Sequence, residues 1–112
     1  MVTINGVELE FDILDANMAE RYEKALARMT DHIEREERPT QIAELIRWEC
    51  SVIYNFFDEI FGEGISLRLF PKRDNLLPCL DAVECLIETA KQQSKRMKRK
   101  INKYAASKRE SK

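Results

Sequence analysis

The sequence has little of what builds turns, disulfides or metal sites. Only 3 Gly and 3 Pro occur among 112 residues, which is too few for the turns of a many-stranded sandwich or barrel. The three cysteines, Cys50, Cys79 and Cys85, include no C-x-x-C pair, and His32 is the one histidine. A structural zinc site needs four such ligands in paired spacing. We therefore expect no metal, and buried thiols that act as small hydrophobes.

Long apolar runs are missing as well. No stretch approaches the roughly 20 apolar residues that span a bilayer. The opening Met1 to Gly6 lacks the basic and apolar parts of a signal peptide. We therefore expect a protein of the cytoplasm with no membrane partner. Hydrophobic residues make up 44% of the sequence and charged residues 35%. This balance favours amphipathic helices in a single domain.

The net charge of −1 hides two parts of opposite sign. Residues 1–90 hold 9 Lys and Arg against 19 Asp and Glu, a net charge of −10. Residues 91–112 hold 10 Lys and Arg against a single acid, a net charge of +9. Such asymmetry is typical of an interaction segment or a solvated arm.

Residues 2–11 predict a β-hairpin. Asn5-Gly6 favours a type I′ turn, because both central residues need a positive φ. This turn sets Ile4 opposite Val7 and Val2 opposite Leu9. One face of the hairpin is then apolar: Val2, Ile4, Val7, Leu9 and Phe11. A two-stranded ribbon is marginal in water by itself, so we expect this face to pack on helices.

Apolar residues at steps of three and four predict two helices in the middle of the chain. The first is capped by Asp15 and ends before Pro39. The second is capped by Thr40, carries the most apolar stripe and ends at Gly62. The sequence of residues 65–70 is compatible with either a short helical turn or an extended segment.

The third helix is expected to start near Asn75 and to run to Tyr104. One seam at heptad spacing follows it, which is typical of a coiled coil: Leu80, Val83, Ile87, Ala90, Ser94, Met97, Ile101 and Tyr104. Residues 105–112 lack this periodicity and predict a disordered basic tail. The expected fold is therefore α+β, mostly α. Residues 1–104 form one domain, an N-terminal hairpin packed on a three-helix bundle with a long basic C-terminal helix.

Residues that could support catalysis are not arranged for it in the sequence. His32 lies on the expected exposed side of the first helix. Asp58 and Glu59 are adjacent, so on a helix they point in different directions. Gly62-Glu63-Gly64 follows a helix, whereas a dinucleotide-binding loop follows a strand. We therefore predict a protein that is not an enzyme and that needs no cofactor.

The basic half of the third helix is the candidate binding segment. A Lys- and Arg-rich helix can bind the phosphates of a nucleic acid or contact another protein. It can also be a solvated helix end whose cations stabilise the helix through its dipole. The apolar seam and the acidic remainder of the chain favour a protein partner, including a second copy of the chain, over nucleic acid. The candidate partner-binding residues are Ser94, Lys95, Met97, Lys98, Ile101 and Tyr104.

Four stretches carry a resemblance to a known family: Ile4 to Asp12, Phe56 to Gly64, Asn75 to Ala82 and Lys100 to Tyr104. In them the chain resembles a family of small, uncharacterised proteins from phages and prophages of Gram-positive bacteria. The resemblance implies a role in tail morphogenesis, as a tail assembly chaperone whose partner is a phage tail component. A competing hypothesis is a phage-encoded inhibitor that binds a host defence protein, such as a nuclease or its nucleic-acid channel, through the acidic part.

Overall fold

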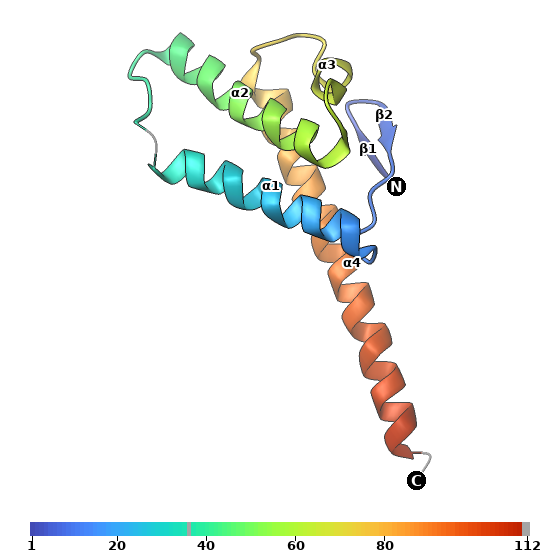
Figure 1. Ribbon diagram of the computed structural model, residues 1–112. Helices are drawn as coiled ribbons and strands as arrows, with labels where there is room; N and C mark the ends of the chain where they lie inside the picture. The colour runs from blue at the N-terminus through green and yellow to red at the C-terminus, as the bar shows by residue number, and fades with distance from the viewer. Residues whose placement is uncertain (36, 111–112) are drawn as a thin grey trace.

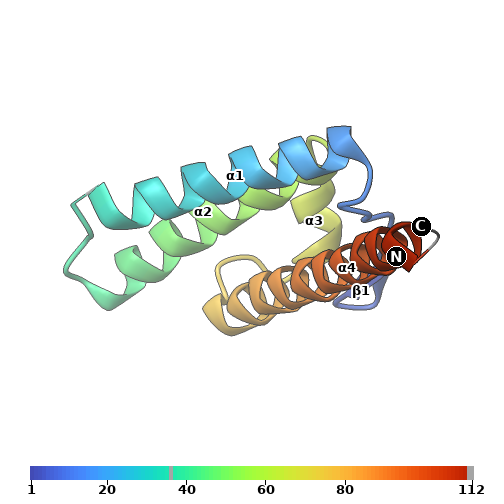
Figure 2. The same ribbon diagram turned by 90° about the horizontal axis from the view of Figure 1, so that it is seen from below.

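The chain folds as a two-stranded hairpin followed by four helices. The computed structural model describes residues 1–35 and 37–110, with side chains up to residue 106. In chain order the elements are β1 (Val2–Ile4), β2 (Val7–Leu9), α1 (Ala16–Arg35), α2 (Ile42–Phe61), α3 (Ile65–Leu69) and α4 (Leu76–Glu110). Helices α1 and α2 lie side by side, α4 runs beneath them, and the hairpin and α3 sit together at one end (Figures 1 and 2). The mostly helical fold with an N-terminal hairpin is as the sequence predicted.

The hairpin has the predicted register. Val2 pairs with Leu9 and Ile4 pairs with Val7 in an antiparallel ladder. Asn5 and Gly6 have φ values of 48° and 79°, as a type I′ turn requires. The Asn5 side-chain amide also donates a hydrogen bond of 3.0 Å to the Leu69 carbonyl. The turn is thereby attached to α3, which the sequence pattern did not indicate.

Aromatic contacts join the hairpin to the helices. Phe11 is 1% exposed, and its ring lies 5.5 Å from that of Tyr22 on α1. The Tyr22 ring lies 6.5 Å from that of Phe56 on α2, whose ring in turn lies 5.2 Å from that of Phe57. Edge-to-face packing of this kind adds to the stabilisation from burial. The apolar face of the hairpin is therefore part of the core, as expected.

The ends of α1 and α2 follow the predicted signals with one exception. The Asp15 carboxylate accepts a hydrogen bond of 3.0 Å from the Met18 N–H and so caps α1. The predicted cap of α2 by Thr40 is wrong. The N-cap is Gln41, which makes no side-chain cap hydrogen bond. The Gln41 carbonyl accepts the first bond of the helix, from the Leu45 N–H, so Thr40 lies one residue too early to cap.

Residues 65–70, for which the sequence left two conformations possible, contain the short helix α3. Gly62 and Gly64, with φ values of 113° and 91°, end α2 and turn the chain. Asp58 then fixes α3, because its carboxylate accepts hydrogen bonds from the Ser66 N–H (2.9 Å) and hydroxyl (3.3 Å). Asp58 is thus half-buried and bonded within the fold.

Helix α4 differs from its prediction in two ways. Its buried line is Cys79, Ala82, Leu86 and Ala90, whereas the predicted seam shares only Ala90 with it and has Leu80 46% exposed. Helix α4 lies close to α2 here, with the Cys79 and Cys50 sulfurs 3.8 Å apart, so mostly small residues face α2 where the heptad pattern placed large ones. The helix also continues beyond Tyr104 to Glu110, where a disordered tail was expected from Ala105. Good helix formers and cations near a helix C-terminus favour this extension, and residues 111–112 lie outside the described part.

Candidate functional site

The C-terminal half of α4 projects from the rest of the molecule. The red end of the ribbon extends well beyond the other elements (Figure 1), and the molecule measures 65 × 31 × 21 Å. We call residues 91–106 the arm. They include seven Lys and Arg and no acid, so the arm carries a high positive charge beside an acidic body.

Gln93 fixes the place where the arm leaves the body. Its side-chain oxygen accepts a hydrogen bond of 2.9 Å from the Ile13 N–H. Its side-chain nitrogen donates one of 2.9 Å to the Phe11 carbonyl. A single side chain therefore satisfies two backbone groups in the segment between β2 and α1. Sequence reasoning missed this residue, because a lone Gln on a helix carries no signal that it will face a loop.

The six predicted partner-binding residues do not share one face. Ser94, Met97, Ile101 and Tyr104 recur at steps of three and four and lie along one side of α4; we call them the partner seam. Ser94 and Met97 are half-buried, whereas Ile101 is 56% and Tyr104 is 66% exposed. The two remaining candidates, Lys95 and Lys98, are exposed and lie farther round the helix, since each residue turns it by about 100°.

A hollow at the base of the arm brings residues from both ends of the chain together. It has a volume of about 380 Å³ and is lined by Met1, Phe11, Asp12, Leu14, Gln93, Arg96 and Lys100. Met1 is 72% exposed and Leu14 is 47% exposed, so apolar surface lies beside the basic side chains. Neither residue was predicted as part of a site, because both lie outside the periodic segments of the sequence.

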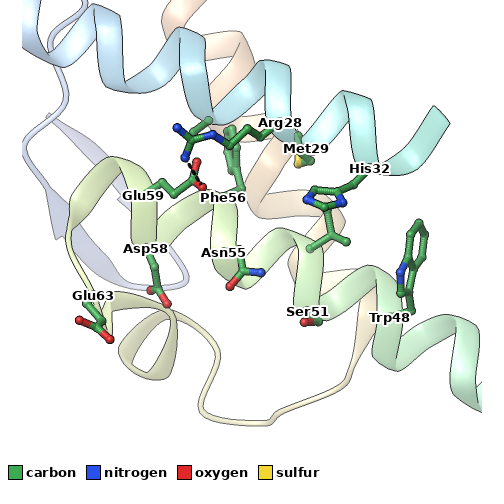
Figure 3. A pocket seen from close by; sticks show the side chains of 12 residues that line it. Arg28, Met29, His32, Trp48, Ser51, Asn55, Phe56, Asp58, Glu59 and Glu63 are labelled. Atoms are coloured by element: carbon green, nitrogen blue, oxygen red, sulfur yellow. Dashed lines mark hydrogen bonds and ion pairs between the residues drawn. The ribbon is translucent and has the colours of Figure 1, made fainter. Parts of the chain in front are cut away.

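A second pocket, of about 450 Å³, lies between α1 and α2. Figure 3 shows His32 and Trp48 toward one end of it and Glu63 toward the other. Arg28 and Glu59 form an ion pair of 2.7 Å across it. This bond links α1 to α2, and its mostly exposed guanidinium makes it a modest contribution to stability. The exposed position expected for His32 is confirmed.

The cysteines divide into two buried and one exposed residue. The Cys50 and Cys79 sulfurs are 3.8 Å apart in the core, between α2 and α4. Burial raises the pKa of Cys79 to about 12 and also raises the pKa of Cys50. Cys85 is exposed, so the expectation that all three are buried is wrong for this residue. It lies on the side of α4 next to β1, where its thiol contacts the Thr3 carbonyl at 3.9 Å.

Two features are absent from the residues that the structure describes. None of their helices combines the length and apolar character that a membrane span needs. Across residues 1–35 and 37–110, no three His, Cys, Asp or Glu side chains gather as metal ligands would.

Comparisons with known proteins place the chain in a family. Neither a curated protein nor a solved structure gives a significant match. One family model, described as a family of unknown function (DUF6673), matches residues 5–112, which is nearly the whole chain. The chain therefore belongs to the DUF6673 family of unknown function.

Proposed function

We propose that this protein takes part in building phage or prophage particles, as a non-enzymatic protein of the tail assembly chaperone type. It acts in the host cytoplasm through contacts with other proteins, and its partner is a phage tail component. The role comes from the sequence resemblance carried by Ile4 to Asp12 and Phe56 to Gly64. The geometry of α4 supplies the surface through which such a role can be performed.

One observation carries the proposal: the partner seam continues beyond the body. Ala90 is 5% exposed, and the exposure rises along the same side of the helix to 56% at Ile101 and 66% at Tyr104. Large apolar side chains exposed in a row on a projecting helix are typical of a surface that another protein covers. A helix that is merely solvated at its end has no need of them.

The charges of the arm set the kind of partner. Lys98 and Lys100 flank the partner seam and are both exposed, so an acidic partner would be held at the rim and steered toward the apolar residues. Such steering weakens with salt, because exposed charges are screened over about 8–10 Å at moderate ionic strength.

The test is a capture experiment from a lysate that contains both phage and host proteins. The protein is immobilised and offered a lysate of the phage-producing host, and the captured proteins are identified by mass spectrometry. Capture of tail components by the native protein, and its loss in a variant with Ile101→Ser and Tyr104→Ser, is the expected result. Lys103→Ser is the matched control, since it changes the same arm away from the partner seam. Equal capture by both variants would refute a role for the partner seam.

A second function is favoured by the acidic body. A net charge of −10 over residues 1–90 can stand in for nucleic-acid phosphates and block the channel of a host nuclease. The same capture distinguishes the two functions. Recovery of a host nuclease, held by the body and released by salt, would replace tail assembly by inhibition of host defence. A gel shift with DNA, lost when the arm is removed, would instead show binding to nucleic acid.

A further inference from the structure

One exposed line of α4 carries charges in a self-complementary order. Eight residues spaced alternately by four and three are all exposed. We call them the charge stripe: Leu77, Asp81, Glu84, Glu88, Lys91, Lys95, Lys98 and Asn102. Three acids thus come first and three lysines follow, with an uncharged residue at either end.

The charge stripe lies on the face of α4 that points away from the body. Its three acids each stand two positions from residues of the buried line, as Glu84 does from Ala82 and Leu86, and its lysines continue the same side of the helix beyond Ala90. Two positions turn the helix by about 200°. In Figure 2, α1 and α2 lie together on one side of α4 and the hairpin lies beside it. The charge stripe itself is exposed at every one of its positions and so remains accessible to a second helix.

We propose that two copies of this protein associate through their charge stripes, with the two α4 helices antiparallel. The intervals between the residues of the charge stripe are the same in both chain directions, and the acids precede the lysines. An antiparallel pair therefore places each acid opposite a lysine. Asp81 faces Lys98 of the partner subunit, Glu84 faces Lys95 of the partner subunit, and Glu88 faces Lys91 of the partner subunit. The twofold axis passes between Thr89 and Ala90, and every pair occurs twice, as an isologous contact requires.

The order of charges is unfavourable in a single helix. Glu84 and Glu88 are like charges four residues apart, and so are Lys91 and Lys95, which destabilises an isolated helix. The helix dipole does not explain the order either, because its effect is confined to the first and last turns, and these four residues lie in the middle of α4. An antiparallel second copy places a countercharge opposite each of them.

Other arrangements of two copies lack this complementarity. A parallel pair would set acids against acids and lysines against lysines, which repel. Pairing of two arms alone would bring fourteen cationic side chains together. The antiparallel arrangement also covers part of Leu77, which is 66% exposed, against Asn102 of the partner subunit. It leaves the partner seam on another side of α4, so the inference does not rest on the proposed function.

The first test is the mass of the full-length protein in solution at low and high salt, by sedimentation. We expect a dimer at low salt that dissociates at high salt, since six exposed ion pairs are screened. A monomer at low salt, up to the highest concentration that stays soluble, would overturn the proposal.

Two charge-reversed variants then test the pairing itself. The lysine-reversed variant carries Lys91→Glu, Lys95→Glu and Lys98→Glu. The acid-reversed variant carries Asp81→Lys, Glu84→Lys and Glu88→Lys. Each should be a monomer at low salt, weakened about tenfold or more, and their equimolar mixture should form a heterodimer. A mixture that stays monomeric while both variants are folded by circular dichroism would overturn the proposal.

A matched control reverses three charges on the other side of the same arm. The variant with Arg96→Glu, Lys100→Glu and Lys103→Glu has the same net charge as the lysine-reversed variant. It should remain a dimer at low salt. Dissociation of this control to the same degree would show that net charge, and not the charge stripe, governs the association.

The orientation is tested by a distance between two spin labels. Asn102→Cys is labelled in a protein with Cys85→Ser, which removes the exposed native thiol. The two labels should lie about 40 Å apart in an antiparallel pair, because 25 residue rises of 1.5 Å separate them along the axis. A separation below about 20 Å would instead indicate parallel helices and refute the arrangement.

Discussion

Replacing Gln93 by alanine should loosen the joint between the arm and the body. The substitution removes two hydrogen bonds of 2.9 Å, one to the Ile13 N–H and one to the Phe11 carbonyl. A neutral hydrogen bond contributes about 0.5–1.5 kcal/mol net, so the two together contribute about 1–3 kcal/mol. The site is partly buried, and water can replace only part of what is lost. We expect the free energy of unfolding to fall by this amount in urea denaturation.

Gln92→Ala is the matched control for this prediction. Gln92 is the neighbouring residue, and its amide donates to the Glu88 carboxylate at 3.0 Å within the exposed surface of α4. An interaction of this kind contributes about 0.2–0.5 kcal/mol, so the control should be close to the native protein. Hydrogen exchange of the Ile13 amide should increase in the Gln93→Ala variant and remain unchanged in the control. Equal stability of the two variants would refute the reasoning that Gln93 holds the segment between β2 and α1.

Three further predictions follow from the core and the arm. Leu9→Ala removes a side chain that is 7% exposed and should lower the free energy of unfolding by about 2–4 kcal/mol; an unchanged thermal melt would show that the hairpin does not pack on the helices. The exposed Cys85 should react with a thiol reagent in the native protein. Burial raises the pKa of Cys79 to about 12, so Cys79 stays a protonated thiol below that pH and should react only on unfolding, since the thiolate is the nucleophile. Equal reaction rates of the two thiols in the native state would contradict this. A chain ending at Lys98 should melt close to the native temperature, and a chain ending at Ala90 should stay folded but melt lower, because it lacks the bonds of Gln93; identical melting of the two shortened chains would refute that difference.

Local signals were sufficient for the hairpin. Asn5-Gly6 requires a turn with two positive φ values, and that turn fixes the register of the residues on either side. The alternation of apolar residues then decides which face is buried. Phe11 followed from the same alternation, and its contacts with Tyr22 on α1 are the consequence.

Caps and breakers located the helices to within a few residues. Asp15 and Gly62 stand where the sequence placed them, because a capping carboxylate and a glycine at positive φ act on their immediate neighbours. Thr40 shows the limit of such reasoning. Thr40 is the better capping residue, yet α2 begins after the adjacent Gln41, whose side chain makes no cap hydrogen bond.

The face that α4 presents to the body was decided by the tertiary structure. The sequence contains both a line of large apolar residues and a line that includes Cys79, Ala82 and Leu86, and either can be read as a buried stripe. Only the shape of the body selects the line with small residues, since a close approach of α4 to α2 needs them at the crossing. The same selection leaves the charge stripe on the open side of the helix.

By itself the sequence determined the mostly helical fold, the hairpin with its register and the division into an acidic body and a basic arm. These properties depend on periodicity, turn chemistry and counted charges, which are local or additive along the chain. The tertiary structure alone decided that Gln93 bonds to the segment after β2, that Asp58 holds α3, and that Cys85 is exposed. Each of these depends on which distant segments meet, and a contact across 80 residues, as between Ile13 and Gln93, leaves no mark in the spacing of either segment.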